Sequence, residues 1–513
     1  MNWLALSNPR ATIRRSPGSV VITIALLTAF IMIVQLMLMA NARADSHGDG
    51  NDWEVWALDQ GSDINRVHVY VLENGEFVEV ERFAFADLDA PHNDVQTPHM
   101  ISFDDSNQYA AIASTASETV SIVRTSDYEV IETIETGATA HMALWAPAPD
   151  NSIWVANIGS KTFTQIEVDL ENETFEIGQD IPLSQNLLEE DWPGWVDTYG
   201  EDLDEWPGVV CHEFTPDGRY AYVTMGPMDG GLVIVDLESG EIEHAYDPSE
   251  VRANCGLAVS HNHDQMYANW SGHLADLDDH DHAEPGEWYV FDIDTHELVG
   301  TYSSEVDGVL GIDPHGQRVS PDGTEMWQVN RVSHDGIVVD TATQEVIDTF
   351  ELVDTPDIIG FSPDGEWLFV SLRGPNPASM PHVAVGQTPG IEVFEVASRE
   401  SVTVLQPFDE DEADASDFHG INVRGPIQDP DEADDSVEAE APADDAVEPD
   451  DATDDDTADL VPATGSESGI TLLVTVMAFG AGALTLVIGL GLRLQSPNCA
   501  CTDQRSLTSS DRR

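Results

Sequence analysis

Five histidines stand at corresponding places in repeated segments of the chain: His99, His141, His212, His315 and His419. Cys255 and Asp357 take that place in two further segments. Four of the histidines lie four residues before an apolar residue near the end of a predicted strand. His212 lies two before, and strand alternation predicts the same side for it. Imidazole, thiolate and carboxylate groups are common ligands of transition metals such as zinc and copper.

These residues support two interpretations. His99, His141, His212, Cys255, His315 and His419 could form a metal site if their segments converge in space. They could equally be structural residues that hydrogen-bond the loop backbone of a neighbouring segment. The cofactor is therefore unknown from the sequence, with a transition metal (copper or zinc) or calcium as the candidates. Calcium fits best with the acidic insertion that starts at His273, where carboxylates are dense.

The segments that carry these residues share one pattern. Each begins with an apolar strand, continues with a turn such as Ser-Pro-Asp-Gly, and ends with an aromatic-rich strand. The apolar residues that align the copies are Phe103, Trp145, Phe214, Val259, Val319, Phe361 and Val423. Their shortest spacings match the roughly 40–45 residues of a four-stranded propeller blade. Short strands with regular turn signals predict an all-β chain.

The two ends of the repeat region complement each other. Residues 54–83 supply three strands with no innermost strand before them, and residues 418–424 supply one strand with nothing after it. We therefore expect a seven-bladed β-propeller closed by pairing of 419–425 with the 54–60 region. Such closure removes exposed sheet edges, and it would bring equivalent positions of the repeats together around one axis.

The strand motifs resemble those of the YVTN-repeat β-propeller family. The carriers of the resemblance are Ala221-Tyr222-Val223-Thr224-Met225, the looser copies at 154–157 and 327–330, and the turns at 215–218, 320–323 and 362–365. The resemblance covers about 370 residues and implies the fold. It implies no function, because propellers host many functions.

The terminal segments predict export and anchoring. Residues 1–44 look like a signal peptide with an Ala-x-Ala cleavage site before Asp45, although an uncleaved anchor is also compatible. After the propeller (45–428), we expect a disordered acidic stalk (429–465), a transmembrane helix (466–494) and a cytoplasmic tail (495–513). The motif Val461, Pro462, Ala463, Thr464 and Gly465 resembles a Leu-Pro-x-Thr-Gly cell-wall sorting signal, with valine in place of leucine.

Composition limits the partners. The chain has 96 acidic and 19 basic residues and a formal charge of -77, which excludes nucleic acid because phosphates would be repelled. The charge suits a surface adapted to salt, where ions screen self-repulsion. The terminal segments point to the cell wall or plasma membrane, and to an extracellular protein, glycan or small molecule as ligand. A disulfide between Cys211 and Cys255 is chemically permitted there.

Two function classes follow. The first is a surface-anchored extracellular binding or interaction module. The second is a metal-binding protein or metal-dependent, oxidoreductase-like enzyme that uses the histidine ring at one mouth of the propeller channel. The sequence contains no nucleotide-binding glycine loop, no Gly-x-Ser-x-Gly elbow and no haem attachment motif. We therefore expect no catalytic residues, and the first class is favoured.

Overall fold

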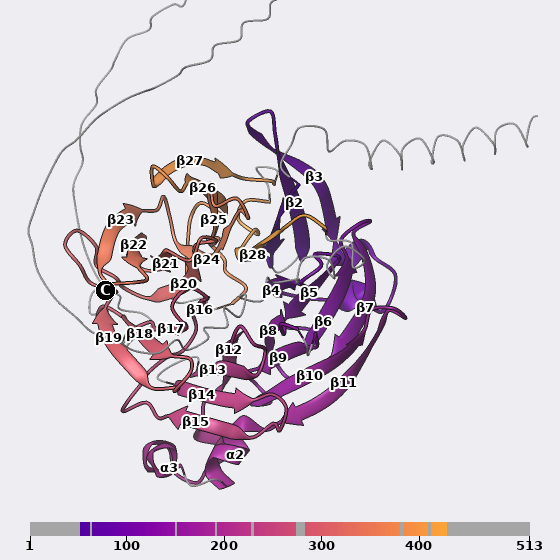
Figure 1. The fold of residues 1–513 in the computed structure, drawn as a ribbon. Helices are drawn as coiled ribbons and strands as arrows, with labels where there is room; N and C mark the ends of the chain where they lie inside the picture. Colours follow the sequence, from indigo (N-terminus) through magenta and orange to yellow (C-terminus); the bar gives the residue numbers. More distant parts are fainter. Residues whose placement is uncertain are drawn as a thin grey trace, which may run out of the picture. The chain divides into compact units, whose positions relative to one another are not determined.

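Seven four-stranded antiparallel sheets surround a central axis in the computed structural model of the chain (Figure 1). The structure describes residues 52–427, except 62–63, 149–150, 190–191, 227–229, 273–282, 380–383 and 409–411. The predicted signal peptide, stalk, sorting motif, transmembrane helix and tail lie outside these residues, as does most of the acidic insertion at His273. Within the described part of the chain, no helix is long and apolar enough to cross a bilayer.

Each sheet is one blade, and its innermost strand is β4, β8, β12, β16, β20, β24 or β28. The first three whole blades are β4(Pro98–Phe103) β5(Tyr109–Ser114) β6(Thr119–Arg124) β7(Glu129–Glu135), β8(Ala140–Trp145) β9(Ile153–Asn157) β10(Thr162–Asp169) β11(Thr174–Ile181), and β12(Gly208–Phe214) β13(Tyr220–Gly226) β14(Gly231–Asp236) β15(Ile242–Tyr246). The next three are β16(Leu257–Ser260) β17(Gln265–Trp270) β18(Glu287–Asp292) β19(Leu298–Ser303), β20(Pro314–Val319) β21(Glu325–Asn330) β22(Asp335–Asp340) β23(Val346–Glu351), and β24(Pro356–Phe361) β25(Trp367–Leu372) β26(Gly390–Glu395) β27(Glu400–Leu405).

The seventh blade joins the two ends of the repeat region, as predicted. Its strand order is β28(Phe418–Arg424), β1(Glu54–Asp59), β2(Arg66–Glu73) and β3(Glu76–Ala84). In the register of β1 and β28, Glu54 pairs with Arg424 and Ala57 pairs with Ile421. The side chains of Glu54 and Arg424 also form a buried ion pair at 2.9 Å. Pairing with β28 thus covers the edge of β1 that the N-terminal strands alone would leave open.

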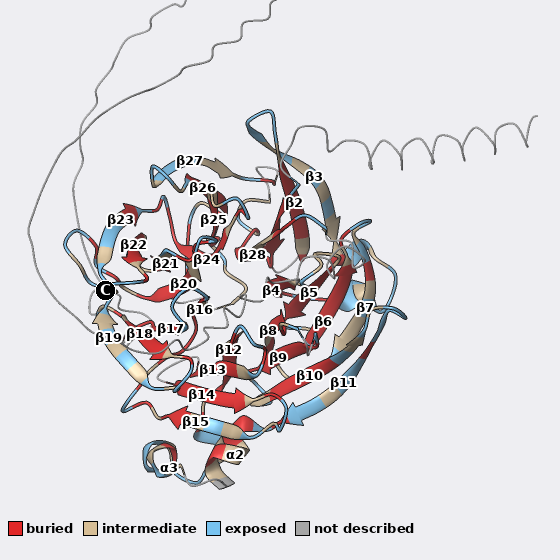
Figure 2. Ribbon diagram, viewed as in Figure 1, coloured by how far each residue is buried: buried red, intermediate tan, exposed pale blue. Residues whose placement is uncertain are grey.

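The core lies between the blades, and burial falls from the axis outward (Figure 2). The inner strands are almost continuously buried, and all six residues of β5 are buried, because each lies between two neighbouring sheets. In the outermost strands, such as β3, exposed residues alternate with half-buried ones because one face of the strand meets water. This outward decrease in burial is expected for sheets arranged radially around an axis, because only their outer strands face solvent.

Among the described residues, short helices lie outside the blades: η1(Phe85–Asp87), η2(His92–Asp94), α2(Leu183–Glu189), α3(Pro193–Tyr199) and η3(Leu203–Glu205). Helices α2 and α3 lie at the rim beside β14 and β15 (Figure 1). There Trp195 is buried, stacks on Trp206 at a centroid distance of 6.2 Å and packs over Gly231. The tryptophan-rich insertion covers the outer part of one blade.

Candidate functional site

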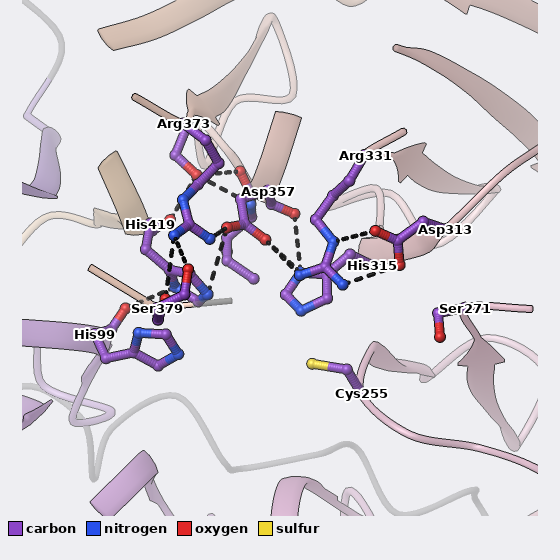
Figure 3. Close-up of polar contacts among 12 residues, drawn as sticks. His99, Cys255, Ser271, Asp313, His315, Arg331, Asp357, Arg373, Ser379 and His419 are labelled. Carbon is purple, nitrogen blue, oxygen red and sulfur yellow. Dashed lines mark hydrogen bonds and ion pairs between the residues drawn. The ribbon is translucent and has the colours of Figure 1, made fainter. Parts of the chain in front are cut away.

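One pocket brings the repeated histidines together near the axis. It is a cavity of about 300 Å³ whose walls include His99, His141, Cys255, His315 and His419. These residues come from the starts of five different innermost strands or the turns that precede them. Val210 of β12 and Arg331, which follows β21, also line it. Five of the six sequence-predicted ligand residues therefore share one cavity, and Asp357 lies directly behind it (Figure 3).

A β-bulge near the start of the innermost strands directs these side chains toward the axis. A β-bulge interrupts the pairing of β4 between Pro98 and Met100, and of β8 between Ala140 and Met142. Equivalent register shifts occur in β12, β20, β24 and β28. A bulge adds one residue to a strand and re-aims the side chain at that point. The histidines occupy these bulges, so they point at the axis and not into the core between blades.

Glycine after the bulge residue lets the innermost strands meet closely. A Cβ atom on Gly420 would stand 2.4 Å from the carbonyl oxygen of His99, and one on Gly316 would stand 2.3 Å from that of Asp357. Any larger residue would push the neighbouring strand away. The His-Gly pairs in the sequence therefore combine an inward side chain with the close contact that brings neighbouring side chains into reach.

His212 does not join the pocket, and the expectation for this residue is corrected. The bulge of β12 falls between Val209 and Cys211, so the two-residue alternation on which the prediction relied is broken. The ring of His212 packs between Phe163 and Phe214, at centroid distances of 4.9 and 5.3 Å. Burial lowers its pKa to about 3. Cys211, which precedes it, lies beside the pocket residue Cys255 instead.

His99 and His141 face each other across the junction of two blades. Their Nε2 atoms are 3.0 Å apart. The Nδ1–H of His99 donates to Oε1 of Gln60 at 2.8 Å, and the Nδ1–H of His141 donates to the carbonyl oxygen of Val210 at 2.9 Å. Gln60 is oriented by its own amide nitrogen, which donates to Asp417 Oδ2 at 2.9 Å. Both neutral imidazoles therefore present the lone pair of Nε2 to one another.

His419 extends this arrangement. Its ring stacks on His99 at a centroid distance of 3.6 Å, and its Nδ1–H donates to the carbonyl oxygen of His99 at 2.9 Å. Its Nε2 then faces Oδ2 of Asp357 at 3.5 Å. Burial, with the neighbouring His419 and His141, lowers the pKa of His99 well below the ordinary value, and burial lowers that of His419 well below it although the charge of Asp357 opposes this. Burial also lowers the pKa of His141. All three rings are therefore neutral at neutral pH.

A buried network of charges supports the pocket from behind (Figure 3). Arg373 contacts Asp357 at 2.5 Å and Asp417 at 2.7 Å, and all three are fully buried. Arg331 pairs with Asp313 at 2.7 Å. Burial alone would raise the pKa of Asp357, but His419, His315 and Arg373 hold it well below its usual range. The network keeps a carboxylate charged at the base of the site.

His315 belongs to this charged network. Its Nδ1 lies 2.6 Å from Oδ1 of Asp357. Burial and Arg331 would lower the pKa of His315, but Cys255 and Asp357 outweigh them and raise it to about 9. Although His315, Asp357 and His419 are close enough to share an ion, His315 is protonated at neutral pH and offers no free lone pair. We therefore assign His315 to the charged network and do not group it with the three neutral histidines as a candidate metal ligand.

Cys211 and Cys255 form the other side of the site. Both thiols are free and buried, with their Sγ atoms 2.8 Å apart. A hydrogen bond from Cys211 lowers the pKa of Cys255 well below the usual value, whereas burial raises that of Cys211. The two cysteines come from neighbouring blades.

Sequence reasoning missed several members of the site. Gln60, Arg331, Asp313 and Asp417 lie outside the repeated position. In the sequence, these residues are notable only as charged or polar residues inside predicted buried strands or at strand ends. They can be assigned to a site only when it is known which strand ends lie together in the fold.

Comparison with known proteins supports the fold alone. No family model matches the chain, and no curated protein matches its sequence. Among solved structures, the chain is similar to a putative 6-phosphogluconolactonase from Bacteroides uniformis, with a TM-score of 0.50 and 14% identity over 70% of this chain and 98% of that one. It is also similar to hydrazine synthase from Kuenenia stuttgartiensis, with a TM-score of 0.43 and 15% identity over 63% of this chain and 82% of that one. At 14% identity, the likeness to the first of these structures concerns the fold alone and says nothing about activity, and the resemblance to YVTN repeats stays a prediction.

Proposed function

We propose that this propeller is a binding module whose ligand is a transition-metal ion held in the axial pocket. The observation that carries the proposal is the contact between His99 Nε2 and His141 Nε2 at 3.0 Å. Two lone pairs repel at that distance unless a cation lies between them. The cation is either a proton or a metal, and the lowered pKa values of both histidines disfavour the proton.

The geometry suits a metal. Two nitrogen ligands of a tetrahedral zinc, each at about 2.0–2.1 Å, lie about 3.3 Å apart. The observed 3.0 Å requires only a small opening of the pair. Each histidine also donates its other ring proton to an oxygen acceptor, the arrangement that orients metal-bound imidazoles in proteins. The Nε2 atom of His419 faces Asp357 at 3.5 Å, and the charge of Asp357 favours a cation nearby.

The donor set selects the class of ion. Imidazole nitrogen suits zinc, copper, iron and nickel, while calcium prefers oxygen ligands. We therefore assign the pocket to zinc or copper. A binding role is in keeping with the propeller fold. We also propose, from the terminal segments of the sequence alone, that the module is displayed at the cell surface through a wall or membrane anchor.

Metal content tests the proposal. The full-length protein, stripped with chelator and dialysed against zinc or copper, should retain close to one ion per chain after gel filtration. His99→Gln and His141→Gln should each lose this ion. His92→Gln is the matched control, because His92 lies at the rim where its Nδ1 contacts Thr133. If the two pocket variants keep as much metal as the control, the ion is held elsewhere and the proposal is wrong.

A further inference from the structure

We infer that Cys211 and Cys255 are a redox-active dithiol that opens on the axial pocket and cycles to a disulfide with small-molecule disulfides. This activity differs in its chemistry from metal binding, because the reacting atoms are the two sulfurs and no imidazole takes part, although Cys211 Sγ lies 3.9 Å from Nδ1 of His141. It rests on four observations: the distance between the sulfurs, the unequal access to them, the charges beside them and their place in the fold.

The two sulfur atoms lie close to the distance of a disulfide bond. Their separation is 2.8 Å, and a disulfide needs about 2.05 Å, so closure asks for an approach of about 0.75 Å. Cys211 is in the middle of β12 and Cys255 lies two residues before β16, where these two innermost strands are neighbours. A shift of this size can be absorbed by side-chain rotation without breaking the ladder of either blade.

The two thiols differ in access. Cys255 lines the cavity and Cys211 does not, although both residues are buried, with 6% and 3% of their surfaces exposed. A reagent that enters the pocket therefore meets Cys255 first. This is the arrangement of an attacking cysteine with a resolving cysteine beneath it, and it gives the two residues different roles in the reaction.

Cationic groups lie around the sulfur of Cys255. The sulfur of Cys255 lies beside the ring of His315 (Figure 3), and Asp357 holds that ring through its Nδ1 at 2.6 Å. Arg331 lines the same part of the cavity. Two cationic groups next to a partly accessible sulfur are the environment in which cysteines react as nucleophiles. Cys211 contacts the same sulfur as hydrogen-bond partner of Cys255.

The reaction balances as a two-electron exchange. The Cys255 thiolate attacks one sulfur of a disulfide R–S–S–R, the S–S bond of the reagent breaks, and R–S⁻ leaves and takes up a proton. The Cys211 thiol then loses its proton, attacks Cys255 Sγ and expels the second R–S⁻, which is protonated in turn. The protein dithiol is oxidised to a disulfide, and the reagent is reduced to two thiols.

Thiol mapping tests the inference on full-length, metal-free protein, so that its outcome is independent of the metal proposal. Cys499 and Cys501 of the tail are replaced by serine in every sample. The probe is bis(2-hydroxyethyl) disulfide, an uncharged reagent that the negative surface does not repel. In the native protein we expect loss of both remaining thiols, a 211–255 cross-linked peptide by mass spectrometry, and full reversal by dithiothreitol without denaturant.

Single variants separate the roles. Cys211→Ser should accumulate a stable hydroxyethyl mixed disulfide at Cys255. Cys255→Ser should leave Cys211 unmodified in the native state, although Cys211 must react after denaturation. Three results would overturn the inference: native protein that keeps both thiols free, a cross-link that dithiothreitol reduces only in denaturant, or native Cys255→Ser protein that forms the adduct at Cys211.

Discussion

His99 and His141 stand on neighbouring blades with their Nε2 atoms 3.0 Å apart, although 42 positions separate them in sequence. Neither atom can donate to the other while both rings are neutral, because each ring proton is already given to an oxygen. Through this contact, the histidines that recur in the repeats form a candidate metal site. The effects of acid, of metal and of substitutions on the protein can be predicted from it.

Acid should weaken metal binding only well below neutrality. Metal and proton compete for the same nitrogen lone pairs. Since burial lowers the pKa values of His99, His141 and His419, protons begin to compete at a lower pH than the about 6.5 of an unperturbed histidine. Zinc affinity measured by competition with a chromophoric chelator should be flat from pH 7.5 to 6.5 and fall below that range. A decline that starts above pH 7 would contradict the assignment of these ligands.

Metal-free protein should lose stability in the same acid range. A histidine whose folded pKa lies below its unfolded value of about 6.5 contributes stability above that pH and loses it as the pH falls. His99 and His419 are such residues. The melting temperature should therefore drop on acidification below about pH 6.5, and less steeply in His99→Gln. Equal slopes for the variant and the wild-type protein would remove His99 from this explanation.

His315 predicts the opposite sign at alkaline pH. Its pKa is raised to about 9, so its contribution is complete below about 6.5 and disappears as the pH rises through 9. The shift corresponds to about 3 kcal/mol at most. The free energy of unfolding should fall between pH 7 and pH 9.5, and His315→Asn should flatten that decline while being less stable at pH 7. If the variant declines as steeply as wild type, the ion pair with Asp357 is not the cause.

Ring closure should depend on the buried pair of Glu54 and Arg424. Arg424→Ala leaves Glu54 buried without its cation, which costs about 3–5 kcal/mol of unfolding free energy. Arg82→Ala breaks an exposed pair with Glu79 and should cost about 1 kcal/mol or less. Urea denaturation measures both.

Deletion of 415–428 should unfold the propeller, since it removes β28 and opens the seventh blade. A truncated protein that melts like the intact one would refute closure as a source of stability.

Salt should stabilise the protein. The formal charge is -77, and the Debye length shortens from about 30 Å at 0.01 M to about 3 Å at 1 M ionic strength, so added salt screens self-repulsion. The melting temperature should rise across that range, with sodium chloride as the test salt. A flat or falling curve would reject the view that this surface is adapted to salt.

The sequence contained the blade number, the closure and most of the pocket. Repeated anchors such as Phe103 and Val423 were sufficient, because closed repeats place equivalent residues around one axis. The bulges were not visible, since they depend on which partner residue each strand pairs with. For that reason the position of His212 was predicted wrongly, and Cys211 was not placed beside the pocket. The charge network of Arg373 and Asp417 was hidden too, because its members come from strand ends that meet only in the folded ring.

The account depends most directly on what lies between His99 and His141. Anomalous diffraction from crystals of the zinc-loaded protein, collected on both sides of the zinc absorption edge, locates the ion without assumptions about its ligands. We predict a single strong peak in the axial pocket, about 2.0–2.1 Å from both Nε2 atoms. A zinc-loaded crystal with no peak there, and with the two rings still in contact at about 3 Å as an N–H···N hydrogen bond, would contradict it.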